Sequence, residues 1–227
     1  MISIITTNWN SYDFLDLLIE SLEIYSSLSY ELIVIDNSTH KQQISREYVF
    51  QHLMETNIGH GAGLNEGSKL AKFDFVMFLD VDTHLLCRNW EDPFIKMMDD
   101  FDVIGGRGVP TKPIRPACML MKKEFAVKYD WRATDGYKGV RVTPEGFDVA
   151  IQAFHQMLND GVKIGFLEGI PNRYKTHTGE EFCIDGKRLV YHHWSGTWLQ
   201  KRQEDFPDVN LFEEKKKLFE SVPWRIL

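Results

Sequence analysis

The sequence predicts an α/β domain in which helices flank a mostly parallel central sheet. The first observation is that short apolar runs rich in β-branched residues alternate with amphipathic stretches through the first half of the chain. The second is the composition of the 227 residues, of which 43% are hydrophobic and 26% are charged, as is typical of a globular protein. Because parallel neighbours need crossover connections, the alternation indicates right-handed strand–helix–strand units covered on both faces.

The first half contains the more regular elements. Apolar runs predict strands, and apolar residues at three- and four-residue spacing predict helices. In chain order we expect a strand at 2–6, a helix at 12–26, a strand at 31–35, a helix in the polar stretch 41–53, a helix at 62–72 and a strand at 75–79.

The second half is less regular. In order, we expect strands at 103–109 and 118–121, a helix at 147–158, a strand at 162–167, a loop-rich stretch at 169–187 and a charged helix at 208–221. The chain shows no internal repeat or low-complexity linker, so we expect residues 1–227 to form a single domain.

Charge and cysteine content argue against several classes of protein. The chain has 26 Lys and Arg against 33 Asp and Glu, a net charge of −7 that argues against nucleic acid as a partner. Its 3 widely spaced cysteines include no C-x-x-C pair, which indicates neither a disulfide framework nor a thiolate zinc site. The apolar opening at 1–5 is too short for a signal peptide, and no run of about 18 apolar residues predicts a membrane span. We therefore expect a cytoplasmic protein, either soluble or at most peripherally attached to a membrane through residues 215–225.

Two carboxylates directly after an apolar run are the strongest local signal for chemistry. Asp80 and Asp82 follow the expected strand at 75–79 and are one residue apart. Two such charges are costly to bury unpaired, and a divalent cation with oxygen ligands would offset them while holding a diphosphate. The alternative is a turn or a helix N-cap, because Asp-x-Asp triplets are common.

A glycine-rich stretch at 57–67 precedes and opens an expected helix. Its glycines would let a phosphate approach backbone N–H groups at the helix N-terminus. The spacing does not match a dinucleotide-binding fingerprint, because Leu64 stands at the third glycine position, and it does not match a P-loop. Close packing of the helix on a strand is the alternative.

Two further clusters carry ionisable groups. His192 and His193 are adjacent, and one of them could reach a metal held by Asp82, although such pairs also occur on surfaces and in cores. Glu145 and Asp148 lie at the start of the helix expected at 147–158. There a carboxylate either interacts favourably with the helix dipole or acts as a general base.

Taken in order, these motifs resemble the inverting glycosyltransferases of family 2, which have the GT-A fold. The resemblance covers roughly residues 1–165. Its segments are Ile5-Thr6-Thr7-Asn8-Trp9-Asn10-Ser11, Ile35-Asp36-Asn37-Ser38-Thr39, the series Asn57, Gly59, Asn65 and Gly67, the pair Asp80 and Asp82, and residues 115–123, which are similar to the strand beneath the family's acceptor site.

The resemblance implies a single Rossmann-like GT-A domain, with residues 1–110 binding a nucleotide sugar, residues 111–205 binding an acceptor and residues 206–227 forming a C-terminal helix. It implies donor contacts at Thr6, Trp9, Asp36, Asn57, Gly59, Asn65, Asp80 and Val81, with Asp36 hydrogen-bonded to a base expected to be uracil. It implies Mn²⁺ or Mg²⁺ bound by Asp80, Asp82 and His192, and acceptor contacts at Ala117, Cys118 and Trp194. Asp148 would be the catalytic base, with Glu145 as the second candidate.

The implied function is metal-dependent, inverting transfer of a sugar from a nucleotide donor, expected to be a UDP-sugar, to a hydroxyl of a glycan or other acceptor. One alternative is a glycosyltransferase acting on modified DNA or on protein. Another is a non-catalytic nucleotide-sugar-binding module. A sugar-nucleotide pyrophosphorylase would need its glycine-rich loop after the first strand, where Thr7 to Asn10 stand. The sequence identifies neither the sugar, the acceptor nor the oligomeric state.

Overall fold

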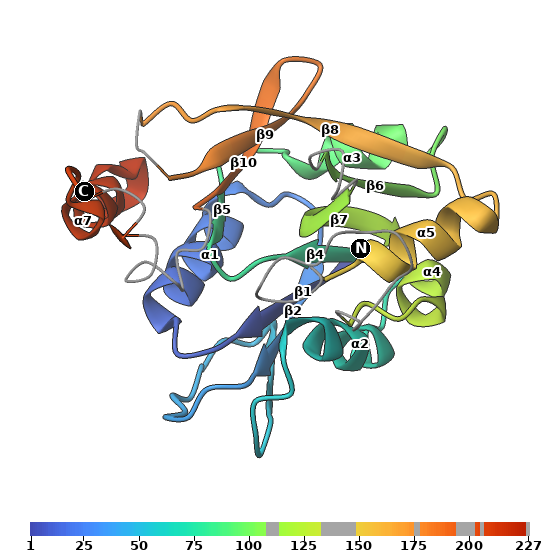
Figure 1. Cartoon of the computed structure of the whole chain (residues 1–227), viewed down its shortest axis with the longest axis horizontal. Coiled ribbons are helices and arrows are strands. Elements are labelled where there is room, and N and C mark those ends of the chain that lie inside the picture. Colours follow the sequence, from blue (N-terminus) through green and yellow to red (C-terminus); the bar gives the residue numbers. More distant parts are fainter. Residues whose placement is uncertain (108–113, 133–148, 175–177, 194–202, 205–206, 226–227) are drawn as a thin grey trace.

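The structure is a computed structural model that describes residues 1–107, 114–132, 149–174, 178–193, 203–204 and 207–225 (Figure 1). The described strands form one mixed sheet in the order β3-β2-β1-β4-β7-β6-β8-β9-β10-β5. Helices flank this sheet, so the expected α/β class is confirmed.

The N-terminal half of the chain forms the parallel part of the sheet. Strand β1 pairs in parallel with both β2 and β4, and β2 pairs in parallel with β3. The carboxyl ends of these strands therefore meet at one edge, where ligands bind in open α/β sheets. The elements are β1 (Ile2–Asn8), α1 (Tyr12–Tyr25), β2 (Tyr30–Asp36), β3 (Val49–Leu53), α2 (His60–Leu70) and β4 (Phe75–Leu79).

The rest of the sheet is mainly antiparallel. Strand β7 pairs antiparallel with β4 and β6, β8 runs parallel to β6, and β8, β9, β10 and β5 then pair antiparallel in series. The remaining elements are β5 (Thr83–Leu85), α3 (Glu91–Met97), β6 (Val103–Arg107), β7 (Ile114–Lys122), α4 (Lys123–Lys128), α5 (Ile151–Asn159), β8 (Ile164–Pro171), β9 (Glu180–Ile184), β10 (Lys187–His192), α7 (Leu211–Ser221) and the 3₁₀ turn η2 (Pro223–Arg225).

Two expected elements are wrong. The polar stretch 41–53 contains strand β3 rather than a helix. Among the described strands β3 pairs with β2 alone, at one end of the sheet order, and its partly exposed residues form no continuous apolar run. The stretch 169–187 contains the end of β8 and all of β9. Asp185 and Gly186, both with positive φ, join β9 to β10 in a tight hairpin turn of the kind that Asp-Gly pairs favour.

The core lies on both faces of the sheet. On one face, Phe14, Leu15 and Leu18 of α1 pack against alternate residues of β1 and β2. On the other, Leu64 of α2 packs against Ile5 and its neighbours. Gly67 allows this close approach, because a Cβ there would clash with Cγ2 of Ile5. Gly63 and Gly67 thus allow close helix–sheet packing, as the alternative interpretation of this stretch proposed.

The C-terminal helix α7 packs beside α1 at one side of the molecule (Figure 1). The rings of Phe14 and Phe219 meet edge to face with centroids 5.1 Å apart. Within the part of the chain that the structure describes, none of the helices combines the length and apolar character needed to cross a membrane.

Candidate donor and metal site

Asp80 and Asp82 lie in a tight turn between β4 and β5. The backbone N–H of Asp80 donates to the carbonyl of Ala117, which ties the turn to β7. The backbone N–H and hydroxyl of Thr83 both donate to the carbonyl of Asp80, at 3.0 and 2.7 Å. Val81, between the two acids, is buried in the core. The turn therefore presents both carboxylates at the carboxyl edge of the parallel strands.

His192 reaches the same point from the end of β10. It pairs with Thr83 of the neighbouring strand β5. Its Nε2 lies 3.5 Å from Oδ1 of Asp82 and 3.7 Å from Oδ2 of Asp80. One ligand atom from each of the three side chains lies within 4.8 Å of the other two. Two carboxylates and an imidazole form a donor set suited to Mn²⁺ or Mg²⁺, so the residues fit the metal that the sequence implies.

The two adjacent histidines have different surroundings. His193 is buried against the rings of Phe14 and Tyr191, and its Nε2 lies 3.1 Å from Nδ1 of His84. Burial lowers the pKa of His193 to about 3, so its ring is neutral. His192 is the one that the structure brings to the acids. Burial alone would lower its pKa, but the neighbouring carboxylates of Asp82, Glu180 and Asp80 outweigh burial and raise that pKa to about 10.

Two residues that sequence reasoning missed adjoin this cluster. His60, the first residue of α2, places Nε2 3.1 Å from Oδ1 of Asp80. Glu180, the first residue of β9, places Oε1 3.7 Å from Nδ1 of His192. His60 lies inside the glycine-rich stretch, where the glycines are the recognisable pattern and a single histidine gives no signal of its own. Glu180 stood in a stretch expected to be loop, so nothing signalled its position.

Asp36, at the end of β2, is fully buried. Its carboxylate accepts hydrogen bonds from Asn8, Tyr12, Gln51 and the backbone N–H of Ser38. Burial favours the protonated form, but hydrogen bonds, those from Ser38 and Tyr12 foremost, outweigh it and lower the pKa of Asp36. The carboxylate is therefore ionised and organises the ends of β1 and β2.

The other donor candidates lie along the same edge. Thr6 is buried, and its hydroxyl makes no hydrogen bond within the described residues. Trp9 is 39% exposed. The side-chain oxygen of Asn57 accepts a hydrogen bond from the backbone N–H of Gly59. Gly59 has a positive φ and directly precedes α2.

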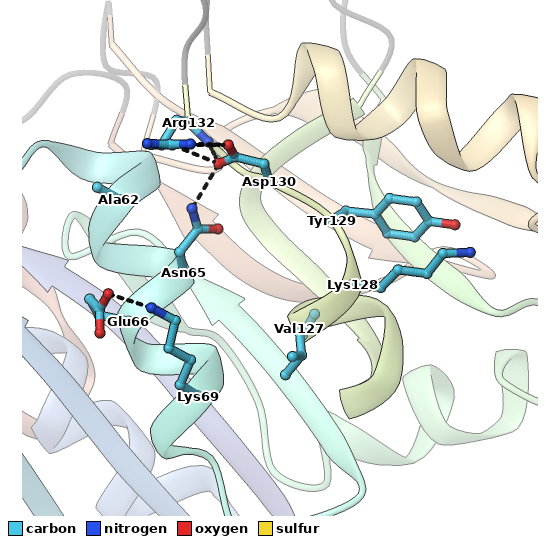
Figure 2. Close-up of a pocket in the computed structure, with 10 residues that line it drawn as sticks. Ala62, Asn65, Glu66, Lys69, Val127, Lys128, Tyr129, Asp130 and Arg132 are labelled. Carbon is cyan, nitrogen blue, oxygen red and sulfur yellow. Dashed lines mark hydrogen bonds and ion pairs between the residues drawn. The ribbon is translucent and has the colours of Figure 1, made fainter.

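Asn65 lines a cavity of about 350 Å³ between α2 and α4 (Figure 2). Its side-chain amide donates to Asp130 at 2.7 Å, and its oxygen accepts the backbone N–H of Trp131 at 3.1 Å. Asp130 also pairs with Arg132. Asp80, Asp82 and His192 do not line this cavity, so it is separate from the metal-ligand cluster.

The acceptor candidates are only partly described. Ala117 and Cys118 lie in β7, buried directly beside the acids, because Cys118 pairs with Leu79. Burial raises the pKa of the Cys118 thiol, which keeps it protonated. Trp194, Glu145 and Asp148 lie outside the described residues, as do residues 108–109 of the strand expected at 103–109 and residues 147–148 of the helix expected at 147–158.

Solved structures share this fold. The TarS fragment 1–349 from S. aureus matches with a TM-score of 0.53 at 19% identity, over 90% of this chain and 61% of that chain. The mannosyltransferase PcManGT from Pyrobaculum calidifontis, solved in complex with GDP-Man and Mn²⁺, matches with a TM-score of 0.52 at 12% identity, over 76% of this chain and 57% of that one. The chain thus spans less than two thirds of these structures. At such identities the likeness establishes the fold alone, which is GT-A.

The sequence itself establishes the family. The model of the family described as Glycosyl transferase family 2 matches residues 3–154, about two thirds of the chain. The chain therefore belongs to glycosyl transferase family 2. No curated protein matches it significantly.

Proposed function

We propose that the protein is a metal-dependent, inverting glycosyltransferase that moves a sugar from a nucleotide donor to an acceptor hydroxyl. The single observation that carries the proposal is the convergence of Asp80, Asp82 and His192 within 4.8 Å at the carboxyl edge of the parallel strands. Family membership supports the class of reaction. The mannosyltransferase of the same fold, solved with GDP-Man and Mn²⁺, supports a nucleoside-diphosphate sugar and a divalent cation.

We propose that the donor lies along the ends of β1, β2 and β4 and the start of α2. The residues involved in donor binding would be Thr6, Trp9, Asp36, Asn57, Gly59, Asn65, Asp80 and Val81. Trp9 offers an exposed ring to a base, and the N–H groups at the start of α2 favour a phosphate. The side chains of Asp36 and Asn65 already make hydrogen bonds within the protein. These two residues would therefore act indirectly, by positioning the groups to which they are bonded. Uracil is our proposed base, with guanine as the alternative that the mannosyltransferase suggests.

In the proposed reaction, Asp148 takes a proton from the acceptor hydroxyl, with Glu145 as the alternative base. The hydroxyl oxygen attacks the anomeric carbon on the face opposite the nucleotide, the bond from that carbon to the diphosphate oxygen breaks, and the configuration inverts. Asp80, Asp82 and His192 would hold Mn²⁺ or Mg²⁺, which supplies positive charge beside the leaving diphosphate. Ala117, Cys118 and Trp194, within residues 111–205, would contact the acceptor, which we propose is a glycan or another hydroxyl compound.

The first experiment is calorimetric titration of the protein with Mn²⁺ and then with UDP or GDP. We expect Mn²⁺-dependent nucleotide binding that Asp82→Asn reduces at least tenfold, because the variant loses a charged ligand. Undiminished nucleotide binding in chelator would contradict the metal assignment.

The second experiment follows donor turnover and the anomeric configuration of the product by NMR. An inverted product that forms only with Mn²⁺ or Mg²⁺ supports the mechanism, and a retained configuration contradicts it. Donor binding without hydrolysis or transfer would instead favour a non-catalytic nucleotide-sugar-binding module. Acceptor assays with glycans, glycosylatable protein and modified DNA separate the remaining alternatives.

A further inference from the structure

Two charged side chains, Arg115 and Glu180, adjoin the metal-ligand cluster on the side of His192. Arg115 of β7 forms an ion pair with Oε1 of Glu180, and the same oxygen lies 3.7 Å from Nδ1 of His192. Glu180 is 9% exposed. Glu180 therefore connects Arg115 to the Nδ1 side of the His192 ring.

The two ring nitrogens of His192 face different groups. Nε2 faces Asp82 and Asp80, the other two ligands of the proposed cluster. Nδ1 is buried and makes no hydrogen bond within the described residues. On that side, Oε1 of Glu180 lies 3.7 Å from Nδ1.

A histidine binds a metal through a nitrogen that carries a lone pair, so the proton must reside on the other nitrogen. A carboxylate beside that second nitrogen holds the proton there and fixes the ring orientation. A charge-assisted hydrogen bond of about 2.8 Å would require the 3.7 Å separation between Nδ1 and Oε1 to shorten.

Several features of the fold hold Glu180 and His192 in place. It stands directly opposite His192 in the antiparallel ladder of β9 and β10. Arg115 holds its carboxylate from one direction. Gly169 of β8 leaves room for it, because a Cβ there would lie 2.9 Å from Oε2. Phe182, two residues along β9, stacks on the His192 ring with an interplanar angle of 15°.

We propose that Glu180 is a positioning residue that orients His192 as a metal ligand. This inference rests on the proposed function, because it assumes that the Asp80, Asp82 and His192 cluster binds a divalent cation. Glu180 would act through His192 and would touch neither the donor nor the metal. Arg115 would keep the carboxylate aimed at Nδ1.

The test measures Mn²⁺ binding to the full chain by titration calorimetry, first with Mn²⁺ alone and then with UDP. We expect Glu180→Ala to weaken Mn²⁺ binding by about 10- to 100-fold, the usual effect of removing an outer partner of a metal ligand. Glu180→Gln, which keeps the shape and one acceptor oxygen, should give a smaller loss in the same direction. This second variant preserves the test if Glu180→Ala does not fold.

Glu181→Gln is the matched control. Glu181 is the next residue of β9 and is fully buried, but its carboxylate pairs with Arg173 and Arg188 instead of His192. This variant should lower the melting temperature while leaving Mn²⁺ affinity unchanged. An equal loss of affinity in Glu181→Gln would overturn the proposal, because damage to β9 would then account for the effect.

A spectroscopic readout isolates the histidine. Electron spin-echo measurements on bound Mn²⁺ detect the nitrogen of a coordinated imidazole, and we expect this signal in the wild type, a weaker one in both Glu180 variants and none in His192→Ala. Unchanged affinity and an unchanged nitrogen signal in the Glu180 variants, with binding still abolished by Asp82→Asn, would overturn the positioning role and leave the proposed function standing. Absence of Mn²⁺ binding by the wild type, with and without UDP, would overturn both.

Discussion

Nε2 of His60 lies 3.1 Å from Oδ1 of Asp80, across the gap between the start of α2 and the end of β4. Oδ2 of the same carboxylate faces His192 at 3.7 Å. Asp80 is therefore held between two imidazoles that come from opposite halves of the chain. The helix that begins at His60 is in this way tied to the candidate metal site.

Replacing His60 tests whether this contact orients Asp80. We expect His60→Ala to weaken Mn²⁺-dependent nucleotide binding severalfold, because Asp80 loses the partner of one oxygen. Stability should change by less than about 0.5 kcal/mol, since both side chains are partly exposed. Calorimetry and thermal unfolding measure the two effects.

His40→Ala is the control for the His60 variant, because His40 is exposed and lies outside every helix and strand. Its nucleotide affinity should equal that of the wild type. Equal affinities in His60→Ala and His40→Ala would show that Asp80 keeps its orientation without His60.

The sequence predicted the elements that carry their own apolar signal. β1, β2 and β4 are buried along nearly their whole length, and each contains a run of apolar and β-branched residues. β9 gave no such signal, because it begins with two buried glutamates, Glu180 and Glu181. Their compensating charges, Arg115, Arg173 and Arg188, come from other strands and loops, and only the folded chain brings them together.

Some residues of the candidate site could likewise be predicted from the sequence, and others could be placed only by the structure. Asp80 and Asp82 were recognisable because polar residues directly after a buried strand stand at the ligand-binding edge of a parallel sheet. The choice between His192 and His193 required the register of β10 on β5, which places His192 opposite Thr83. Asp148 and Glu145 remain predictions, since they lie outside the described residues.

Asp36 provides a prediction about pH. Its pKa is lowered in the folded protein, so the folded state binds the proton more weakly than the unfolded state does. The ionised carboxylate therefore contributes stability above the usual pKa of 3.8, and this contribution is lost as the pH falls through the lower folded value. At neutral pH, Asp36→Asn should cost about 2 kcal/mol or more, because its amide cannot accept from all the donors that surround it.

Urea unfolding of the wild type and Asp36→Asn, at about pH 7 and about pH 3, tests this linkage. The difference in unfolding free energy should be largest at neutral pH and should shrink in acid. Other titrating groups are common to both proteins and cancel in the difference. A difference independent of pH would contradict the assignment of an ionised, hydrogen-bonded Asp36.

Gly67 tests the packing of α2 on the sheet. Alanine would normally stabilise a helix interior by about 1 kcal/mol relative to glycine. Here the added Cβ would clash with Cγ2 of Ile5, so we expect Gly67→Ala to lower the free energy of unfolding by about 1–3 kcal/mol. In an Ile5→Ala background, the same substitution should cost clearly less. Equal costs in the two backgrounds would assign the effect to something other than this contact.

Asn65 tests whether α2 is joined to the segment 130–132 by hydrogen bonds that only an amide can make. Its nitrogen donates to Asp130 and its oxygen accepts the N–H of Trp131 (Figure 2). Asn65→Ala should lower the free energy of unfolding by about 1–2 kcal/mol. Asn65→Asp should cost more at neutral pH, because the hydrogen bonds from Arg132 hold the pKa of Asp130 well below its usual range, so two carboxylates would then face each other.

The Asn65 variants also separate a structural role from a donor-binding role. If Asn65 only joins α2 to the segment 130–132, added salt should recover part of the loss in Asn65→Asp but none in Asn65→Ala, because screening weakens only the repulsion between charges. Nucleotide affinity, measured at a temperature where both variants are folded, should then match the wild type. A loss of nucleotide affinity in Asn65→Ala without a matching loss of stability would instead place Asn65 in direct contact with the donor.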